Sequence, residues 1–129
     1  IHLLDLARVL TGDEILTVSC EMDVVPPDGA ERRVVGRLTT SGGLVCLVDV
    51  SRVSSGRGGR VEMIGSEGQL WPSIAEPTVL GTLRAFVKSV RNGLPPPVTI
   101  EDGKRAVEIA EACYASARQG GRVVPVEYL

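Results

Sequence analysis

The sequence predicts a single α+β domain in which an open, mainly antiparallel β-sheet carries helices packed on one face. Segments with helical periodicity lie at residues 2–10, 78–92 and 99–120, on either side of a run of extended segments. Short turns that contain glycine join the extended segments, and such turns favour antiparallel hairpins. Helices that are segregated in sequence from a run of strands are typical of the α+β class.

The first 25 residues predict one helix followed by one strand. Leucines recur at helical spacing in residues 2–10, and Gly12 ends that pattern. Residues 14–25 are rich in β-branched and apolar side chains, which favours a strand. We expect this strand to stop at the Pro-Pro-Asp-Gly sequence of residues 26–29, because proline and glycine interrupt regular structure.

Four further extended segments predict two hairpins. Residues 33–40 and 44–53 flank a Ser-Gly-Gly turn, which is short enough for a hairpin. Residues 54–59 read as a glycine-rich loop. Residues 60–65 and 69–71 flank a Glu-Gly turn and predict a second, smaller hairpin.

The C-terminal part predicts two helices and a last extended segment at residues 122–126. The helix at 78–92 has one apolar face, and Gly93 and three prolines follow it, which prevents its continuation. The helix at 99–120 begins with a predicted capping box, in which Thr99 is the N-cap and Asp102 lies three residues on.

The helix at 99–120 is predicted to bury a stripe of small side chains, so that it can lie close to the sheet. The residues of this stripe are Ala106, Ala110, Cys113 and Ala117, with Val107 and Tyr114 beside them. Charged residues fall on the opposite, solvent-facing side: Lys104, Glu108, Glu111 and Arg118.

Composition and charge narrow the classes of function. Of the 129 residues, 43% are hydrophobic and 23% charged, as in ordinary soluble globular domains. The net charge of −2 favours neither nucleic acid nor a membrane surface as a partner, and no apolar run is long enough to span a bilayer. The chain starts within a helical pattern, without a methionine or a signal peptide pattern, so we expect a piece of a longer cytoplasmic protein.

The potential chemical groups do not form a complete active site by themselves. Cys20, Cys46 and Cys113 are far apart in sequence, which favours buried reduced thiols over disulfides or a zinc site. His2 is the only histidine, and the glycines of residues 54–59 do not lie between a strand and a helix as phosphate-binding glycines do. Residue types alone therefore indicate no more than a domain that packs against a partner.

Three segments carry a resemblance to a known family. Residues 1–15 resemble the helix that opens the second domain of the Gfo/Idh/MocA oxidoreductases, the relatives of glucose–fructose oxidoreductase and inositol dehydrogenase. Residues 59–70, G-R-V-E-M-I-G-S-E-G-Q-L, resemble a hairpin of that domain. Residues 101–126, which contain E-D-G-K-R-A and S-A-R-Q-G-G-R-V, are similar to its closing helix and tail.

The resemblance implies that residues 1–129 are the C-terminal substrate-binding and oligomerisation domain of a larger two-domain oxidoreductase. Its fold would be the open sheet of the glyceraldehyde-3-phosphate dehydrogenase-like C-terminal domains. NAD or NADP would bind to an N-terminal Rossmann domain, which this sequence lacks. The expected partners are that domain, further copies of the chain through the exposed sheet face, and a small sugar or polyol substrate, with no nucleic acid or membrane.

The resemblance also implies candidate site residues. His2 stands where the family has a catalytic histidine, which takes or returns the proton of the reacting hydroxyl. Arg52 and Arg57 are the candidates for substrate binding, whereas Asp5 is expected to be structural. Trp71 is expected either to stack on a sugar ring or, preferably, to be covered at an interface.

Two other hypotheses remain open at this point. The parent could be a non-catalytic binding or regulatory relative that keeps the fold, or the domain could stand alone and only dimerise. If the parent is an oxidoreductase, the 129 residues alone are expected to be inactive, because the cofactor domain is missing.

Overall fold

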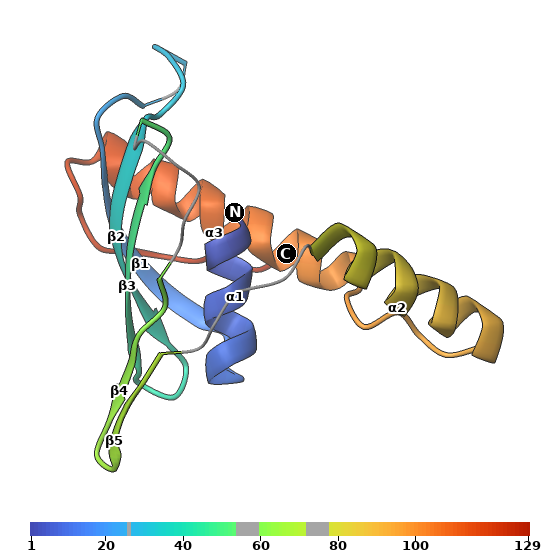
Figure 1. Ribbon diagram of the computed structural model, residues 1–129. Helices are drawn as coiled ribbons and strands as arrows, with labels where there is room; N and C mark the ends of the chain where they lie inside the picture. Colours follow the sequence, from blue (N-terminus) through green and yellow to red (C-terminus); the bar gives the residue numbers. More distant parts are fainter. Residues whose placement is uncertain (26, 54–59, 72–77) are drawn as a thin grey trace. The chain divides into compact units, whose positions relative to one another are not determined.

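The computed structural model describes residues 1–25, 27–53, 60–71 and 78–129 (Figure 1). Contacts between residues divide the chain into two compact units. The larger unit combines Ile1–Val53 with Val98–Leu129, and the smaller unit is Ser54–Pro97. The larger unit contains the main sheet and the hydrophobic core.

A four-stranded sheet forms the centre of the larger unit. Its strands are β1 (Ile15–Met22), β2 (Arg33–Thr40), β3 (Val45–Ser51) and β6 (Val124–Pro125). The strands lie in the order β3-β2-β1-β6, and every neighbouring pair is antiparallel. The Ser-Gly-Gly turn joins β2 to β3 as predicted, and Gly43 in this turn has a φ of 82°, a value that favours glycine. The predicted mainly antiparallel sheet is confirmed.

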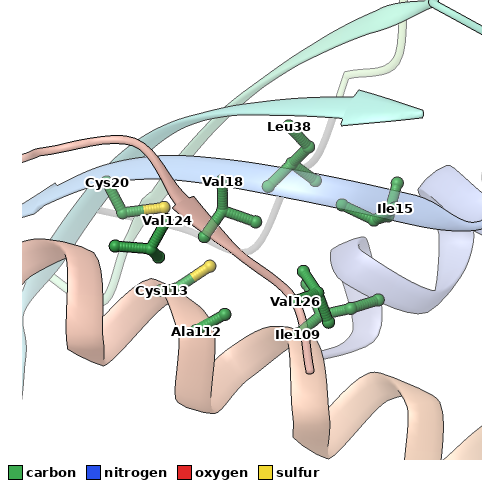
Figure 2. Close-up of a cluster of buried hydrophobic side chains, with 9 residues drawn as sticks. All are labelled: Ile15, Val18, Cys20, Leu38, Ile109, Ala112, Cys113, Val124 and Val126. Carbon is green, nitrogen blue, oxygen red and sulfur yellow. The ribbon is translucent and has the colours of Figure 1, made fainter. Parts of the chain in front are cut away.

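Two helices lie with this sheet, α1 (His2–Thr11) and α3 (Ile100–Arg118). Helix α3 packs across β1 and also contacts α1 (Figure 1). Buried side chains from β1, β2, α3 and the C-terminal tail form one cluster between helix and sheet (Figure 2). The members of this cluster are Ile15, Val18, Cys20, Leu38, Ile109, Ala112, Cys113, Val124 and Val126.

The opposite face of the sheet is exposed. Strand register places Cys20 beside Gly36 on the core face, where both residues are buried. The next residues along β2 and β3, Arg37 and Leu47, pair with one another and point to the opposite face. Leu47 is 80% exposed there, so this face has the apolar surface that the sequence predicts for contact with a partner.

Strand β1 is shorter than predicted, because Asp23 organises the turn that follows it. The predicted strand runs to residue 25, whereas β1 ends at Met22. One carboxylate oxygen of Asp23 accepts hydrogen bonds from the backbone N–H groups of Arg32 and Arg33, at 2.8 and 3.0 Å. These bonds hold the two ends of the connection together and start β2 at Arg33. Strand β3 is also shorter than its predicted range of 44–53.

The start of α3 agrees with the sequence, but its buried stripe does not. The Thr99 hydroxyl accepts from the Asp102 N–H, and the Asp102 carboxylate accepts from the Thr99 N–H, so the capping box is confirmed. The buried residues of α3 are Ala106, Glu108, Ile109, Ala112, Cys113 and Ser116. The predicted stripe is therefore wrong at Ala110 and Ala117, which are only half-buried, and at Val107, which is 47% exposed.

Glu108 lies on the buried side of α3, although the sequence places it on the solvent-facing side. Its carboxylate accepts from the backbone N–H of Leu129 at 2.9 Å and from Arg105 at 3.1 Å. The C-terminal tail therefore covers a side of α3 that the sequence assigns to solvent. These bonds lower the pKa of the Glu108 carboxyl, with the Leu129 N–H as the largest cause, and keep a buried charge satisfied.

The smaller unit contains a hairpin and one helix. Its elements are β4 (Met63–Gly65), β5 (Gly68–Leu70) and α2 (Thr78–Asn92). The two strands pair antiparallel, as predicted, although β4 starts three residues later than its predicted range of 60–65. Helix α2 has its predicted bounds, and Gly93 follows it with a φ of 62°.

Candidate functional site

His2 is the first residue of helix α1, and its side chain is exposed. The backbone carbonyl of Ile1 accepts the N–H groups of Leu4 and Asp5 and so begins the helix. Within the part of the chain that the structure describes, no residue forms a hydrogen bond or an ion pair with the His2 imidazole. The described residues therefore leave both ring nitrogens of His2 without a partner.

Arg8 fixes the helix that carries His2. Its guanidinium donates two hydrogen bonds to the Glu14 carboxylate, at 3.0 and 2.9 Å, and ion pairs with Asp5 at 3.3 Å and Asp102 at 3.6 Å. The side chain of Arg8 is only 12% exposed. It thus ties α1 to the start of β1 and to the first turn of α3, and Asp5 has the structural role predicted for it.

The pKa values in this network follow from the same contacts. The hydrogen bonds to Glu14 raise the pKa of Arg8, and Arg8 in turn lowers the pKa of the Glu14 carboxyl. Arg8 and Glu14 therefore both stay charged near neutral pH. Because the network holds its charges by mutual pairing, we assign it to the support of α1 and not to acid–base chemistry.

Arg52 follows the last residue of β3 and pairs with a residue that the sequence did not indicate. Its backbone N–H donates to the carbonyl of Arg32 at 2.8 Å, and its guanidinium donates to the Glu31 carboxylate at 2.7 Å. The Arg52 side chain is 65% exposed, whereas that of Glu31 is only 15% exposed. The hydroxyl of Tyr114, from α3, lies beside the same carboxylate.

The proximity of these side chains shifts the pKa values of Tyr114 and Glu31. Burial, followed by the negative charge of Glu31, raises the pKa of the Tyr114 phenol. The backbone N–H of Glu31 itself, followed by the Arg52 guanidinium, lowers the pKa of the Glu31 carboxyl. Glu31 is therefore a carboxylate at neutral pH, and it balances the charge of Arg52.

An open groove brings this cluster and the start of α1 together. Ile1, which precedes His2, lines the groove with Glu31, Arg52 and Tyr114. Of the predicted site residues, Arg52 lines the groove, whereas His2 is the neighbour of a lining residue and does not itself line it. Arg57, the other predicted substrate-binding residue, lies outside the described residues.

Sequence reasoning missed Glu31 and Tyr114. Glu31 lies in the connection between β1 and β2, where no motif marks it, and Tyr114 reads as the flank of an apolar stripe. Their partnership joins residues that are far apart in the chain. A spacing rule could not have found it.

Trp71, in the smaller unit, is exposed in the single chain, which leaves it accessible to the partner surface or the sugar that the sequence predicts for it. Its side chain is 53% exposed, and the Arg60 guanidinium lies over its ring at 5.9 Å from the centroid. This distance is compatible with a weak cation–π contact. Whether Trp71 meets a sugar or a protein partner stays a prediction.

The described residues provide neither a metal site nor a dinucleotide site. No group of three or more His, Cys, Asp or Glu side chains is placed to hold a metal ion in that part of the chain. Dinucleotide-binding units use parallel strands joined through a helix, whereas each strand pair described here is antiparallel. Cys20 and Cys113 are buried free cysteines, as predicted, whereas Cys46 is free but only partly buried. None of the described helices combines the length and hydrophobicity of a bilayer span.

Comparisons with known proteins agree with this architecture. A family model described as "GFO/IDH/MocA C-terminal domain" matches residues 1–71, and one described as "Oxidoreductase family, C-terminal alpha/beta domain" matches residues 78–126. The myo-inositol 2-dehydrogenase of Thermotoga maritima is 26% identical over 151 residues, which cover 92% of this chain and 45% of that protein.

Solved structures show the same fold. A myo-inositol dehydrogenase from Corynebacterium glutamicum is 26% identical, with a TM-score of 0.81 over 99% of this chain and 48% of its own. The myo-inositol dehydrogenase from Lactobacillus casei, in complex with NAD(H) and myo-inositol, also has a TM-score of 0.81, at 20% identity over 99% of this chain and 46% of its own. The chain spans about half the length of these relatives.

Proposed function

Because the chain belongs to the GFO/IDH/MocA oxidoreductase family, we propose that it is the substrate-binding and oligomerisation domain of a two-domain NAD(P)-dependent oxidoreductase. The proposed reaction is the oxidation of a CH–OH group in a sugar, a polyol or a related hydroxy compound. The observation that carries this proposal is the exposed His2 at the start of α1, which has no hydrogen-bond or ion-pair partner among the described residues and lies within the segment that the family model covers. Similarity to inositol dehydrogenases supports a polyol as substrate.

His2 is the proposed proton-transfer residue. A neutral imidazole can accept the hydroxyl proton as the carbon is oxidised and can return it in the reverse direction. The Arg8 network holds α1 in place, so the position of the imidazole is set by a well-anchored helix. Arg52 is the proposed contact for substrate oxygen atoms, and Arg57 stays a second candidate from the sequence.

The nicotinamide cofactor, which accepts the hydride in this reaction class, is proposed to bind to another domain. The antiparallel strands of this chain do not fit such a cofactor, so no step is assigned to it here. The chain alone is therefore expected to show no turnover with NAD(P)⁺.

The exposed sheet face is the proposed contact between copies of the chain. Val35, Val45 and Leu47 lie on it with exposures of 43%, 49% and 80%. Apolar side chains gathered on an open sheet face support a subunit interface. Light scattering during size-exclusion chromatography measures the resulting mass.

The test of the proposed reaction uses the full-length protein that contains this chain. Reduction of NAD⁺ and NADP⁺ is followed by absorbance with myo-inositol and a panel of sugars. The His2→Asn variant should lower kcat by about 10²- to 10⁴-fold, the usual contribution of a positioned general base, and change KM much less. Leu3→Ala, a change in the same helical turn, serves as the control and should keep most of the activity.

Either of two results would contradict the proposal. One is full activity in His2→Asn, which would remove the proton-transfer role. The other is a wild-type protein that binds NAD(H) and a polyol but never turns over. That result would favour the non-catalytic binding or regulatory relative.

A further inference from the structure

Arg52 is the outermost member of the cluster that it forms with Glu31 and Tyr114. A guanidinium has five N–H donors, and the structure uses one of those of Arg52 for Glu31, at 2.7 Å. The Arg52 side chain remains 65% exposed in the groove, whereas the Glu31 carboxylate lies largely covered beside Tyr114. Arg52 therefore presents to the groove a guanidinium whose other donors have no partner among the described residues and whose charge is balanced by Glu31.

Elsewhere in the groove, negatively and positively charged side chains also occur together. Glu111 and Arg118 lie about one helical turn before and after Tyr114 on α3, and both line the groove. Over the whole described lining, four glutamates accompany three arginines. An anionic ligand would thus find no excess of positive charge to offset the loss of its hydration.

Neutral hydroxyl groups suit this surface better. Each hydroxyl both donates and accepts, and here guanidinium donors stand next to carboxylate and phenol oxygen atoms. Neighbouring hydroxyls of one ligand can accept from Arg52 and donate to Glu31. A carboxylate in the same place would accept from Arg52 but meet the like charge of Glu31.

We propose that this cluster makes the groove selective for neutral polyhydroxy compounds over their carboxylated counterparts, and that Glu31 sets the preference by neutralising Arg52. The inference rests on the proposed function, because it takes the groove beside α1 as the substrate site. It goes further by defining the charge of the substrate and by naming the residue that decides it.

Binding, and not turnover, provides the test. Dissociation constants of the full-length protein are measured by calorimetry for two matched pairs, glucose with glucuronate and galactose with galacturonate. The members of each pair differ only in a CH₂OH or a carboxylate group. The wild type should bind the neutral member more tightly in both pairs.

The Glu31→Gln variant keeps the size and hydrogen-bonding capacity of the side chain but removes its charge. It should shift the neutral-to-anionic affinity ratio toward the carboxylate by about tenfold at low ionic strength, and salt should reduce the shift. Adding Arg52→Gln should abolish the shift. Glu67→Gln, in the β4–β5 turn, removes one charge elsewhere and should leave the ratio unchanged.

The possible outcomes separate this inference from the proposed function. An unchanged ratio in Glu31→Gln, an equal shift in Glu67→Gln, or no binding of any of the four ligands would overturn the inference. A loss of general folding would weaken both members of a pair equally, so the ratio is insensitive to it. If the ratio shifts as expected but the wild type never reduces NAD(P)⁺, the oxidoreductase proposal fails while the charge preference stands.

Discussion

Ser116 joins helix α3 to strand β1 through hydrogen bonds inside the core. Its Oγ accepts from the backbone N–H of Cys20 at 2.9 Å and donates to the backbone carbonyl of Arg122 at 2.6 Å. The side chain is fully buried. Strand β6 pairs with β1 only at Thr17 and Val18, so the serine provides the acceptor for β1 beyond the end of β6.

The Ser116→Ala variant should lose about 2 kcal/mol of unfolding free energy. A buried donor without a partner costs about 1–3 kcal/mol, and the N–H of Cys20 would become such a donor. The carbonyl of Arg122 contributes less, because Arg122 is exposed and water can reach that residue. Alanine offsets roughly 0.5 kcal/mol through its higher helix propensity, so the net effect is well above the effect of propensity alone.

Urea unfolding of the chain, followed by circular dichroism, measures this loss. The midpoint should fall at an unchanged m-value, since the change affects stability and not the surface exposed on unfolding. Ser89→Ala in α2 is the matched control, because the described part of the chain offers no hydrogen-bond partner to the Ser89 hydroxyl. A Ser116→Ala protein within about 0.5 kcal/mol of wild type, or an equal loss in Ser89→Ala, would refute the reasoning.

Two further changes test the turn after β1 and the packing of the sheet. The backbone N–H groups of Arg33 and Arg32 lower the Asp23 pKa from 3.8 to about 2, so its stabilisation is present above pH 3.8 and is lost as the pH falls toward 2. Asp23→Asn should therefore be less stable than wild type at neutral pH and lose less stability on acidification, as measured by urea midpoints at several pH values; an identical pH profile would contradict the assignment. A Cβ at Gly36 would lie 2.6 Å from the Cys20 sulfur, so Gly36→Ala should cost about 1–3 kcal/mol. That cost should shrink in a Cys20→Ala background, and thermal unfolding of the four proteins of this double-mutant cycle would show no coupling if the contact were unimportant.

Elements that depend on neighbouring residues could be predicted from the sequence. The capping box of α3 joins Thr99 to Asp102, three residues apart, and the β2–β3 turn depends on consecutive glycines. The buried side of α3 could not be predicted in the same way. It depends on the Leu129 N–H, which donates to Glu108, 21 residues earlier in the chain. It also depends on Ser116, whose hydroxyl accepts from the N–H of Cys20 in β1, 96 residues earlier.

The candidate site shows the same division. The family resemblance identifies His2 and Arg52 as candidates, but it does not indicate which residue neutralises the charge of Arg52. Glu31 precedes β2, Arg52 follows β3, and Tyr114 lies on α3, so only the hairpin and the helix packing bring them together. The sequence predicts a positive charge at Arg52, whereas the pairing with Glu31 that balances this charge depends on the folded chain.

The position of the tail at the sheet has a consequence for synthesis on the ribosome. Tyr128 donates its hydroxyl to the carbonyl of Ile15, 113 residues earlier in the chain, and Ser19 donates to the carbonyl of Gly121, 102 residues later. At the usual elongation rates these partners are translated roughly 5 to 25 seconds after β1. Until then the β1–β3 meander has an apolar face without its helix, and a nascent chain in that state is a natural client for chaperones that shield exposed strands.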